Sequence, residues 1–425
     1  DWSSDVCSSD LLYLWNNLFR PLEFARATGF FPSAYYVVVV LGLSLLIGMA
    51  RGTIRLRFNY FIASFSVFLA WELLASVLSP FRSTALAEFG VQLKYVIPIF
   101  FISASLRHRK DVVFVLLVSA LSIGTWSVQA GLHAMAAGRA VPSMGIPGSQ
   151  MSQNNEFMVA TNTIIPILVA FGLLYGRKKM SLVVRCGLLG AAFVSTAAIV
   201  FSNSRGATVG FLANCVLYLI LVSKNKIRDW VIFGLLLAVG YQFLPQSFFD
   251  RMETIELGGE QTEASARGRL NLMKNAWQCT LDHPVKGIGL DGWLHVAREY
   301  ADDYHEPHCA YLKVSTSTGF PGLALYLFTI FLVVYRLFRA RAAARVHGDT
   351  VGEGISVALL MSIFGFAVPQ IFGNYPFMEL FIVVLGVSAA FTTLPDCFLK
   401  REDAPSDESE SDNSSQGLND NQATS

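Results

Sequence analysis

Residues 304–322, YHEPHCAYLKVSTSTGFPG, carry side chains that could do chemistry, just ahead of an apolar stretch. His305 and His308 stand three residues apart with Pro307 between them, and the pair Gly319-x-x-Gly322 follows. A neutral histidine can accept a proton from a hydroxyl group at physiological pH. Three interpretations of His308 are open: a catalytic base at a membrane surface, part of a metal site, or the polarity of an ordinary loop.

The two histidines are poorly spaced for a metal site. A helical pair of metal ligands needs histidines at i and i+4, whereas HEPH has them at i and i+3, and its proline interrupts a helix. Oxygen ligands are nevertheless close by, from Asp302, Asp303 and Glu306. We therefore expect no metal here and keep a mixed histidine–carboxylate site as the alternative.

Three arginines are candidates for holding a phosphate group. Arg205 lies in the turn Ser204-Arg205-Gly206 between two apolar stretches, where Gly206 would let the turn close. Its planar guanidinium suits either one specific phosphate or lipid headgroups in general. Arg267 and Arg269 lie in the first turn of a predicted helix. Cations there oppose the helix dipole, so we expect them to serve a ligand.

That predicted helix begins near Ser265 as its cap and ends before Pro284. Apolar residues recur along it at helical spacing and predict a face that packs on the membrane or on the rest of the protein; they are Leu270, Met273, Ala276, Trp277 and Leu281. Cys279 and Cys309 lie in the same loop and would form a disulfide if the compartment is oxidising.

The composition places these residues in a membrane protein. The chain is 53% hydrophobic and only 15% charged, with a mean hydropathy of +0.48. Soluble domains are about a quarter charged, and the apolar blocks here reach the roughly 20 residues that cross a bilayer. Basic residues are scattered in short loops rather than massed, which excludes nucleic acid as a partner. We predict an all-α polytopic membrane protein.

Apolar stretches are the predicted spans; they run at about 34–50, 60–79, 89–106, 112–137, 157–176, 181–202, 207–223, 229–244, 320–338, 355–373 and 376–395. LLYLWNNLF at 11–19 looks like the tail of a truncated first helix, which makes about eleven or twelve. Residues 1–10, DWSSDVCSSD, do not fit the apolar pattern. We expect an artefact or a disordered segment there, with a genuine short tail as the alternative.

The loop charges predict sidedness. Loops rich in Lys and Arg alternate without a break with loops that hold one arginine or none. The positive-inside rule puts the rich loops in the cytoplasm. The loop 245–319, the loop 138–156 and the Arg205 turn are then extracytoplasmic. The chain divides into an N-terminal transmembrane part (11–244), the catalytic loop (245–319), C-terminal transmembrane helices (320–395) and a disordered acidic cytoplasmic tail (396–425).

Two ionisable residues fall inside predicted spans, where charges are costly and often functional. Glu72 and Lys94 lie at similar depths from the outer ends of consecutive spans, so an ion pair between them is expected. The pair would be either purely structural or part of substrate binding. With Arg267, these two residues are our candidates for binding substrate.

The motifs together resemble the O-antigen ligase and polymerase superfamily of bacterial envelope glycosyltransferases. The first similar element is the Ser204-Arg205-Gly206 turn, and the second is GRLNLMKNAW, which carries Arg269, followed by HPVKGIG. The third is His308 with Cys309 next to it, then nine residues, then Gly319-x-x-Gly322. Cys309 departs from the family, which usually has Ser, Asn or Gln there. GIPGSQMSQNNEFMVATNTIIPIL and YLWNNLFRP resemble most the O-glycosylation ligases of exosortase A systems.

The resemblance implies a multi-pass protein of the bacterial inner membrane with its active site facing the periplasm. It implies a glycan on undecaprenyl diphosphate as donor, a hydroxyl of a glycan, lipid or protein as acceptor, and no metal or other cofactor. Arg205 and Arg269 would stabilise the leaving diphosphate, and His308 would take the acceptor's proton; Lys94 is a weaker phosphate ligand. The alternatives are a repeat-unit polymerase and, in a different class, a secondary transporter, which should show internal repeats and midplane charges.

Overall fold

The computed structural model describes residues 8–21, 33–52, 56–139, 141–143, 145–175, 181–242, 260–300 and 305–394. None of these residues lies in a β-strand, which confirms the all-α prediction. The helices in the predicted spans are α3 (Ser33–Ala50), α4 (Tyr60–Val77), α5 (Arg82–Ser105), α6 (Arg109–Ala137), α7 (Asn154–Ala170) with the π-helical turn η1 (Phe171–Tyr175), α8 (Leu182–Phe201), α9 (Arg205–Leu221), α10 (Lys226–Gln242), α14 (Ala310–Val346), α15 (Thr350–Ala367) and α16 (Glu379–Thr393). Each predicted span therefore coincides with a helix.

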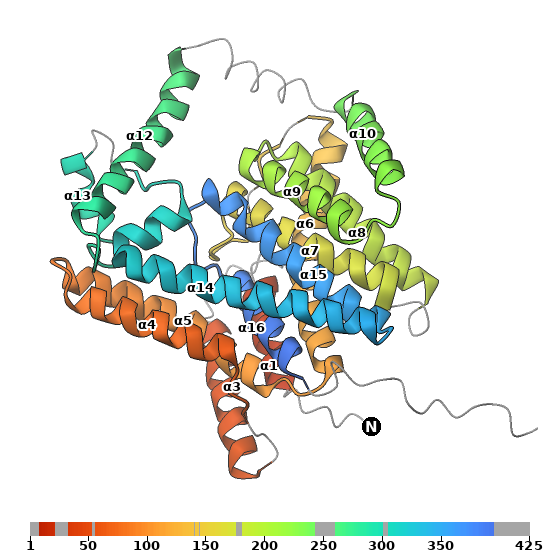
Figure 1. Ribbon diagram of the computed structural model, residues 1–425, viewed down its shortest axis with the longest axis horizontal. Coiled ribbons are helices and arrows are strands. Elements are labelled where there is room, and N and C mark those ends of the chain that lie inside the picture. Colours follow the sequence, from red (N-terminus) through yellow and green to blue (C-terminus); the bar gives the residue numbers. More distant parts are fainter. Residues whose placement is uncertain are drawn as a thin grey trace, which may run out of the picture.

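Seven of the described helices are long and apolar enough to cross a membrane, and α9, α16 and part of α3 are shorter apolar helices. The protein is therefore a polytopic α-helical membrane protein, as predicted. α16 is the central helix of the bundle: nearly every residue from Glu379 to Thr392 is buried. A helix that is apolar on all sides is stable only when other helices surround it. α14 lies along α4 and α15, and α7 packs on α15 (Figure 1).

The chain enters the bundle earlier than predicted. Ser8 begins α1 (Ser8–Phe19), so the first-ten-residue segment is not wholly outside the fold. Asp10 is buried and accepts a hydrogen bond from Ser105 Oγ at 3.0 Å. Further along α1, Tyr13 Oη and Asn17 Nδ2 donate to Glu379 Oε1 at 3.1 and 3.0 Å. These contacts tie α1 to α5 and α16; residues 1–7 and the predicted tail 396–425 lie outside the described residues.

The loops gather in two groups at opposite ends of the bundle. At one end Arg109 pairs with Asp349, and the guanidinium of Arg341 donates to the Leu221 carbonyl. At the other, Lys286 Nζ donates to the Leu78 carbonyl at 3.2 Å and Asn154 Nδ2 to the Ser202 carbonyl at 3.0 Å. These are the groups that the charge alternation separates. Which group faces the cytoplasm stays a prediction.

Asp349→Asn tests the ion pair between Arg109 and Asp349 at the predicted cytoplasmic end of the bundle. Asp349 caps α15 by accepting from Gly352 N at 2.9 Å, and it accepts from Arg109 Nη1 at 3.0 Å. Burial by itself raises the pKa of Asp349, but the hydrogen bonds from Arg109 and the cap amides outweigh burial and hold the pKa below its usual range. Asparagine keeps the cap and removes the charge, so we expect a loss of about 1–2 kcal/mol at neutral pH.

The pH dependence gives this prediction its control. A carboxyl whose folded-state pKa is lowered contributes stability above its unfolded pKa of about 4, and that contribution is lost as the pH falls through the folded-state pKa. The gap between wild type and Asp349→Asn in thermal unfolding, measured in detergent, should therefore shrink as the medium is acidified below about pH 4. A gap that is independent of pH would mean that the charge is not responsible.

Candidate functional site

The Gly319-x-x-Gly322 pair breaks α14 and docks the outer loop at the break. Gly319 has φ 69° and ψ −175°, so α14 is two helices joined there, and it starts ten residues before the predicted span. The break frees the carbonyls of the preceding turn, and three donors satisfy them: Ile288 N to Thr316 O at 2.8 Å, Gly289 N to Ser317 O at 2.9 Å, and Trp71 Nε1 to Thr318 O at 2.8 Å. Phe320 N in turn donates to Pro284 O at 2.8 Å.

This contact between the outer loop and α14 forms a lock. Glycine is required on both sides of the lock because the two backbones pack directly against each other. A Cβ at Gly319 would lie 2.3 Å from the Val285 carbonyl oxygen, and a Cβ at Gly287 would lie 2.5 Å from the Thr316 carbonyl oxygen. Gly287 also has a positive φ of 63°. The HPVKGIG turn and the Gly-x-x-Gly pair are therefore one structural device, which holds the long loop against α14. The spacing alone did not reveal this.

His308 lies immediately before the start of α14 and is half-buried. The next residue, Cys309, is the N-cap of α14 with extended backbone, and it makes no side-chain cap hydrogen bond. Ser and Asn are favoured N-caps because their oxygens accept from the exposed amides of the first turn. A Ser or Asn at this position would therefore be suited to cap α14.

Cys309→Ser should therefore stabilise the protein. Burial raises the pKa of the Cys309 thiol, and this effect outweighs the opposite effect of the nearby amides of Leu312 and Tyr311. The group is therefore a neutral thiol, whose sulfur accepts hydrogen bonds more weakly than a hydroxyl oxygen does. A serine hydroxyl at this position should accept an amide hydrogen bond and add about 0.5–1 kcal/mol to the free energy of unfolding, with activity unchanged. Thermal unfolding in detergent measures this, with Cys309→Ala as the control that offers no cap. Equal stability of the serine and alanine variants would refute the capping role.

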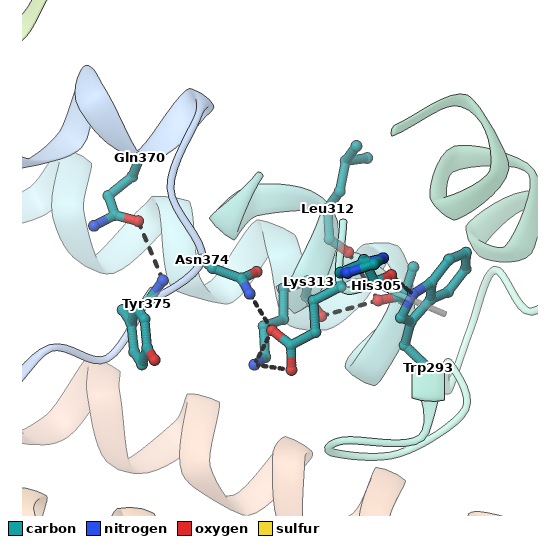
Figure 2. Close-up of polar contacts among 9 residues, drawn as sticks. Trp293, His305, Leu312, Lys313, Gln370, Asn374 and Tyr375 are labelled. Atoms are coloured by element: carbon teal, nitrogen blue, oxygen red, sulfur yellow. Dashed lines mark hydrogen bonds and ion pairs between the residues drawn. The ribbon is translucent and has the colours of Figure 1, made fainter. Parts of the chain in front are cut away.

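A polar network joins the segment of His308 to the loop before α16. Glu306, two residues ahead of His308, accepts from Lys313 Nζ at 3.0 and 2.9 Å, and it also accepts from Asn374 Nδ2. Gln370 Oε1 accepts from Tyr375 N at 3.3 Å. Figure 2 shows Lys313 and Asn374 converging from α14 and from the loop that follows η2 (Pro369–Ile371). Trp293 Nε1 donates to the His305 carbonyl at 2.9 Å and holds the other side of the segment.

A cavity of about 110 Å³ opens beside this network. That is room for several water molecules, since one occupies roughly 10–15 Å³ on this measure. Its lining comes from α4, α5, the loop before α7, the outer loop, α14 and the loop before α16; it is Glu72, Glu88, Val91, Gln92, Tyr95, Gln150, Leu290, Asp291, Lys313, Val314, Ser317, Asn374, Tyr375, Pro376 and Phe377. Two groups of the Glu306 network, Lys313 and Asn374, therefore also line the cavity.

The expected Glu72–Lys94 ion pair is wrong. Glu72 is fully buried, and its Oε2 accepts from Gln92 Nε2 at 2.9 Å. Lys94 is two residues further along α5, which turns its side chain away, and it is exposed and absent from the cavity lining. The rotation of a side chain about the helix axis, and not only its position along the helix, decides its neighbour.

Arg205 is exposed at the first position of α9. The turn before it closes through Asn203, whose φ is 56°, and not through Gly206 as expected. A Cβ at Gly206 would lie 3.7 Å from the Pro369 carbonyl oxygen and from Phe372 Cβ. The start of α9 thus borders η2, whose chain continues into the cavity residues Asn374 and Tyr375. Arg205 and the His308 segment lie on two sides of one loop.

The outer-loop helix is α12 (Glu260–Asp282), which begins five residues before the expected cap. It packs through Leu272, Ala276 and Cys279 onto the small helix α13 (Trp293–Tyr300), and α12 also contacts α14 (Figure 1). Of the predicted apolar face, Ala276 packs on the protein, whereas Leu270, Trp277 and Leu281 are 56%, 46% and 45% exposed, so their packing on the membrane stays a prediction. Trp277 does contact Phe320, with ring centroids 5.6 Å apart.

Arg269 is exposed one turn before the packed part of α12, and it pairs with no residue that the structure describes. The side chain of Arg267 lies outside the described residues. Cys279 and Cys309 are both buried as free thiols, so the disulfide is not formed. Of the ligands in the metal alternative, Asp302 and Asp303 lie outside the described residues, and Glu306 is engaged by Lys313. No cluster of three or more His, Cys, Asp or Glu occurs in the described part of the chain.

The sequence analysis missed most of the cavity. Glu88, Gln92 and Tyr95 follow one another at i, i+4 and i+7 and so share one face of α5, which is a signal that the sequence does contain. Asp291, Lys313 and Asn374 carry no such signal, because only the docking of three separate segments makes them neighbours.

Two known families match separate parts of the chain. Residues 190–327 match the family described as O-Antigen ligase. Residues 11–173 match a family of unknown function, DUF5935. No curated protein matches the chain. The region that matches the O-antigen ligase family includes Arg205, Arg269, His308 and the glycines that join the outer loop to α14, and the match supports the resemblance to the O-antigen ligase superfamily.

Proposed function

We propose that this protein is a membrane glycan ligase, which transfers a glycan from undecaprenyl diphosphate to an acceptor hydroxyl on the periplasmic side. One observation carries the proposal: the segment of His308, which lies in the region that matches the O-antigen ligase family, is joined by Glu306 to a cavity with both polar and apolar lining, at the end of the bundle where the long loop docks. An enzyme that transfers glycans needs a cavity of this kind, close to its general base, in which the sugar can bind.

The proposed chemistry uses the residues as follows. Neutral His308 takes the proton of the acceptor hydroxyl while its oxygen attacks the anomeric carbon of the donor. The bond from that carbon to the diphosphate oxygen breaks, and the lipid diphosphate leaves with the electron pair. Arg205 and Arg269 stabilise the negative charge that develops on it. Both guanidiniums are exposed and accessible to a lipid-anchored phosphate; Arg267 is proposed to assist them.

The remaining assignments are part of the same proposal. We place the protein in the bacterial inner membrane on its resemblance to the O-antigen ligase superfamily, and its active site on the periplasmic side on the charge alternation of its loops. The reaction is proposed to be independent of metal, and the subtype to be that of exosortase A systems, on the GIPGSQMSQNNEF segment. Glu72 is proposed to contact substrate through the cavity that it lines, and Lys94 to act only from outside that cavity.

Reconstitution tests the proposal. Purified protein in liposomes is supplied with glycan on undecaprenyl diphosphate and with candidate acceptors, with and without a metal chelator. A ligase should transfer one glycan to a finished acceptor, whereas a polymerase should build a ladder on the lipid carrier. Arg205→Ala and Arg269→Ala should each lower transfer about 10²-fold or more. Wild-type rates in both arginine variants and in His308→Ala would refute the assignment.

A further inference from the structure

The cavity beside the His308 segment has the chemistry of a carbohydrate subsite and not of a phosphate site. We propose that it binds one sugar ring of the glycan substrate through the ring's hydroxyl groups, while the lipid diphosphate lies elsewhere. The identity of the ligand as a glycan substrate rests on the proposed function. The location and the selectivity for hydroxyl groups rest on the residues that line the cavity.

The first argument is an unsatisfied acceptor inside the cavity. Glu72 is fully buried, yet only its Oε2 is bonded; Oε1 is buried with no partner in the described part of the chain. Leaving a buried acceptor unpaired costs about 1–3 kcal/mol, and more for a charged group. Asn374, which also lines the cavity, has a buried Oδ1 with no partner in the described part of the chain. Two unpaired polar groups on residues that line one cavity suit a ligand with several hydroxyl groups, because a hydroxyl both donates and accepts hydrogen bonds.

The second argument is the sign of the charge. Two accessible carboxyl side chains line the cavity, Glu88 and Asp291, against one cation, Lys313. That lysine is already held by Glu306 at 2.9 Å. Like charges brought together at a binding site cost several kcal/mol, so this lining disfavours a diphosphate. A neutral sugar meets no such penalty, and an amino sugar would gain an ion pair.

The third argument is the aromatic part of the lining. Tyr95, Tyr375 and Phe377 offer flat surfaces for the C–H face of a sugar ring beside the polar groups, which is the mixture that small-molecule sites use. Burial, together with the negative charges of Glu156 and Glu306, raises the pKa of Tyr375. Its hydroxyl therefore stays protonated at neutral pH and can donate a hydrogen bond.

The probe for this site is a hexosamine that carries a photoreactive diazirine, added to the purified full-length protein in detergent. Peptide mapping should find crosslinks in residues 88–95 and 372–377. Unlabelled hexosamine disaccharide should compete, and pyrophosphate should not. Glu72→Gln and Asn374→Ala should lower labelling about tenfold, as should Glu88→Gln, whose exposed side chain at the rim can change without disturbing the fold. Glu353→Gln, at the opposite end of the bundle beside Arg345, is the matched control.

The outcomes separate this inference from the proposed function. Labelling that survives all three cavity variants, or that pyrophosphate removes, overturns the sugar site even if transfer depends on His308. Labelling that behaves as described supports the site even if the protein transfers no glycan. Competition by glycan-linked lipid diphosphate, but not by an unlinked acceptor glycan, assigns the bound ring to the donor. The reverse pattern assigns it to the acceptor, and either pattern supports a sugar subsite.

Discussion

His308→Ala is expected to lower glycan transfer by about 10²–10⁴-fold, the contribution typical of a general base. The histidine precedes the cap of α14 and is half-buried, so its removal takes away a proton acceptor without removing a core side chain. The measurement is the initial rate of transfer in liposomes at saturating donor. Binding of the glycan-linked lipid diphosphate should change little, because the variant keeps the arginines and the cavity.

His305→Ala is the matched control, three residues away in the same segment. Trp293 bonds to the backbone carbonyl of His305, and alanine keeps that carbonyl. We expect a rate within about twofold of wild type, since a surface substitution away from the reacting groups is usually within ±0.5 kcal/mol. If the two variants lose activity equally, the segment matters through its conformation and His308 is not the base.

Gly319→Ala is expected to release the outer loop from the bundle. The backbone at Gly319 has a conformation that is essentially open to glycine alone. An added Cβ would also lie 2.3 Å from the Val285 carbonyl oxygen and 2.7 Å from that of Pro284. The strain and the lost hydrogen bonds between the loop and α14 together should cost at least about 3 kcal/mol. Protease cleavage in the outer loop and hydrogen exchange of Ile288 and Gly289 amides measure the release.

Gly348→Ala is the control that separates the cost of backbone strain from the cost of a steric clash. Gly348 also has a positive φ, 67°, but an added Cβ would have no atom within 4 Å. The substitution should cost only about 1–2 kcal/mol and leave the outer loop protected. Glycan transfer should be lost in Gly319→Ala and kept in Gly348→Ala. Unchanged protection of the loop in Gly319→Ala would show that the two glycine motifs do not form a lock.

The sequence by itself determined the helices, the apolar spans and the two groups of loops. Crossing a membrane depends on hydropathy within about 20 consecutive residues, so it is readable locally. The charge of each loop is local as well, and the loops that it groups, such as those of Arg109 and Asp349, are in contact. For the same reason the sequence could single out His308, Arg205 and Arg269 as candidates, although their roles stay predictions.

Only the tertiary structure decided which face of each helix meets which partner. Periodicity predicted an apolar stripe on α12, but it did not identify Leu272 and Cys279, which pack on α13 together with Ala276. The same holds for Glu72, which contacts Gln92 instead of Lys94. At the break before Gly319, the Thr318 carbonyl accepts a hydrogen bond from Trp71, which is 247 residues away in the sequence. Helical period fixes relative angles within one helix, whereas the choice of partner depends on contacts between distant segments, and these contacts alone create the cavity.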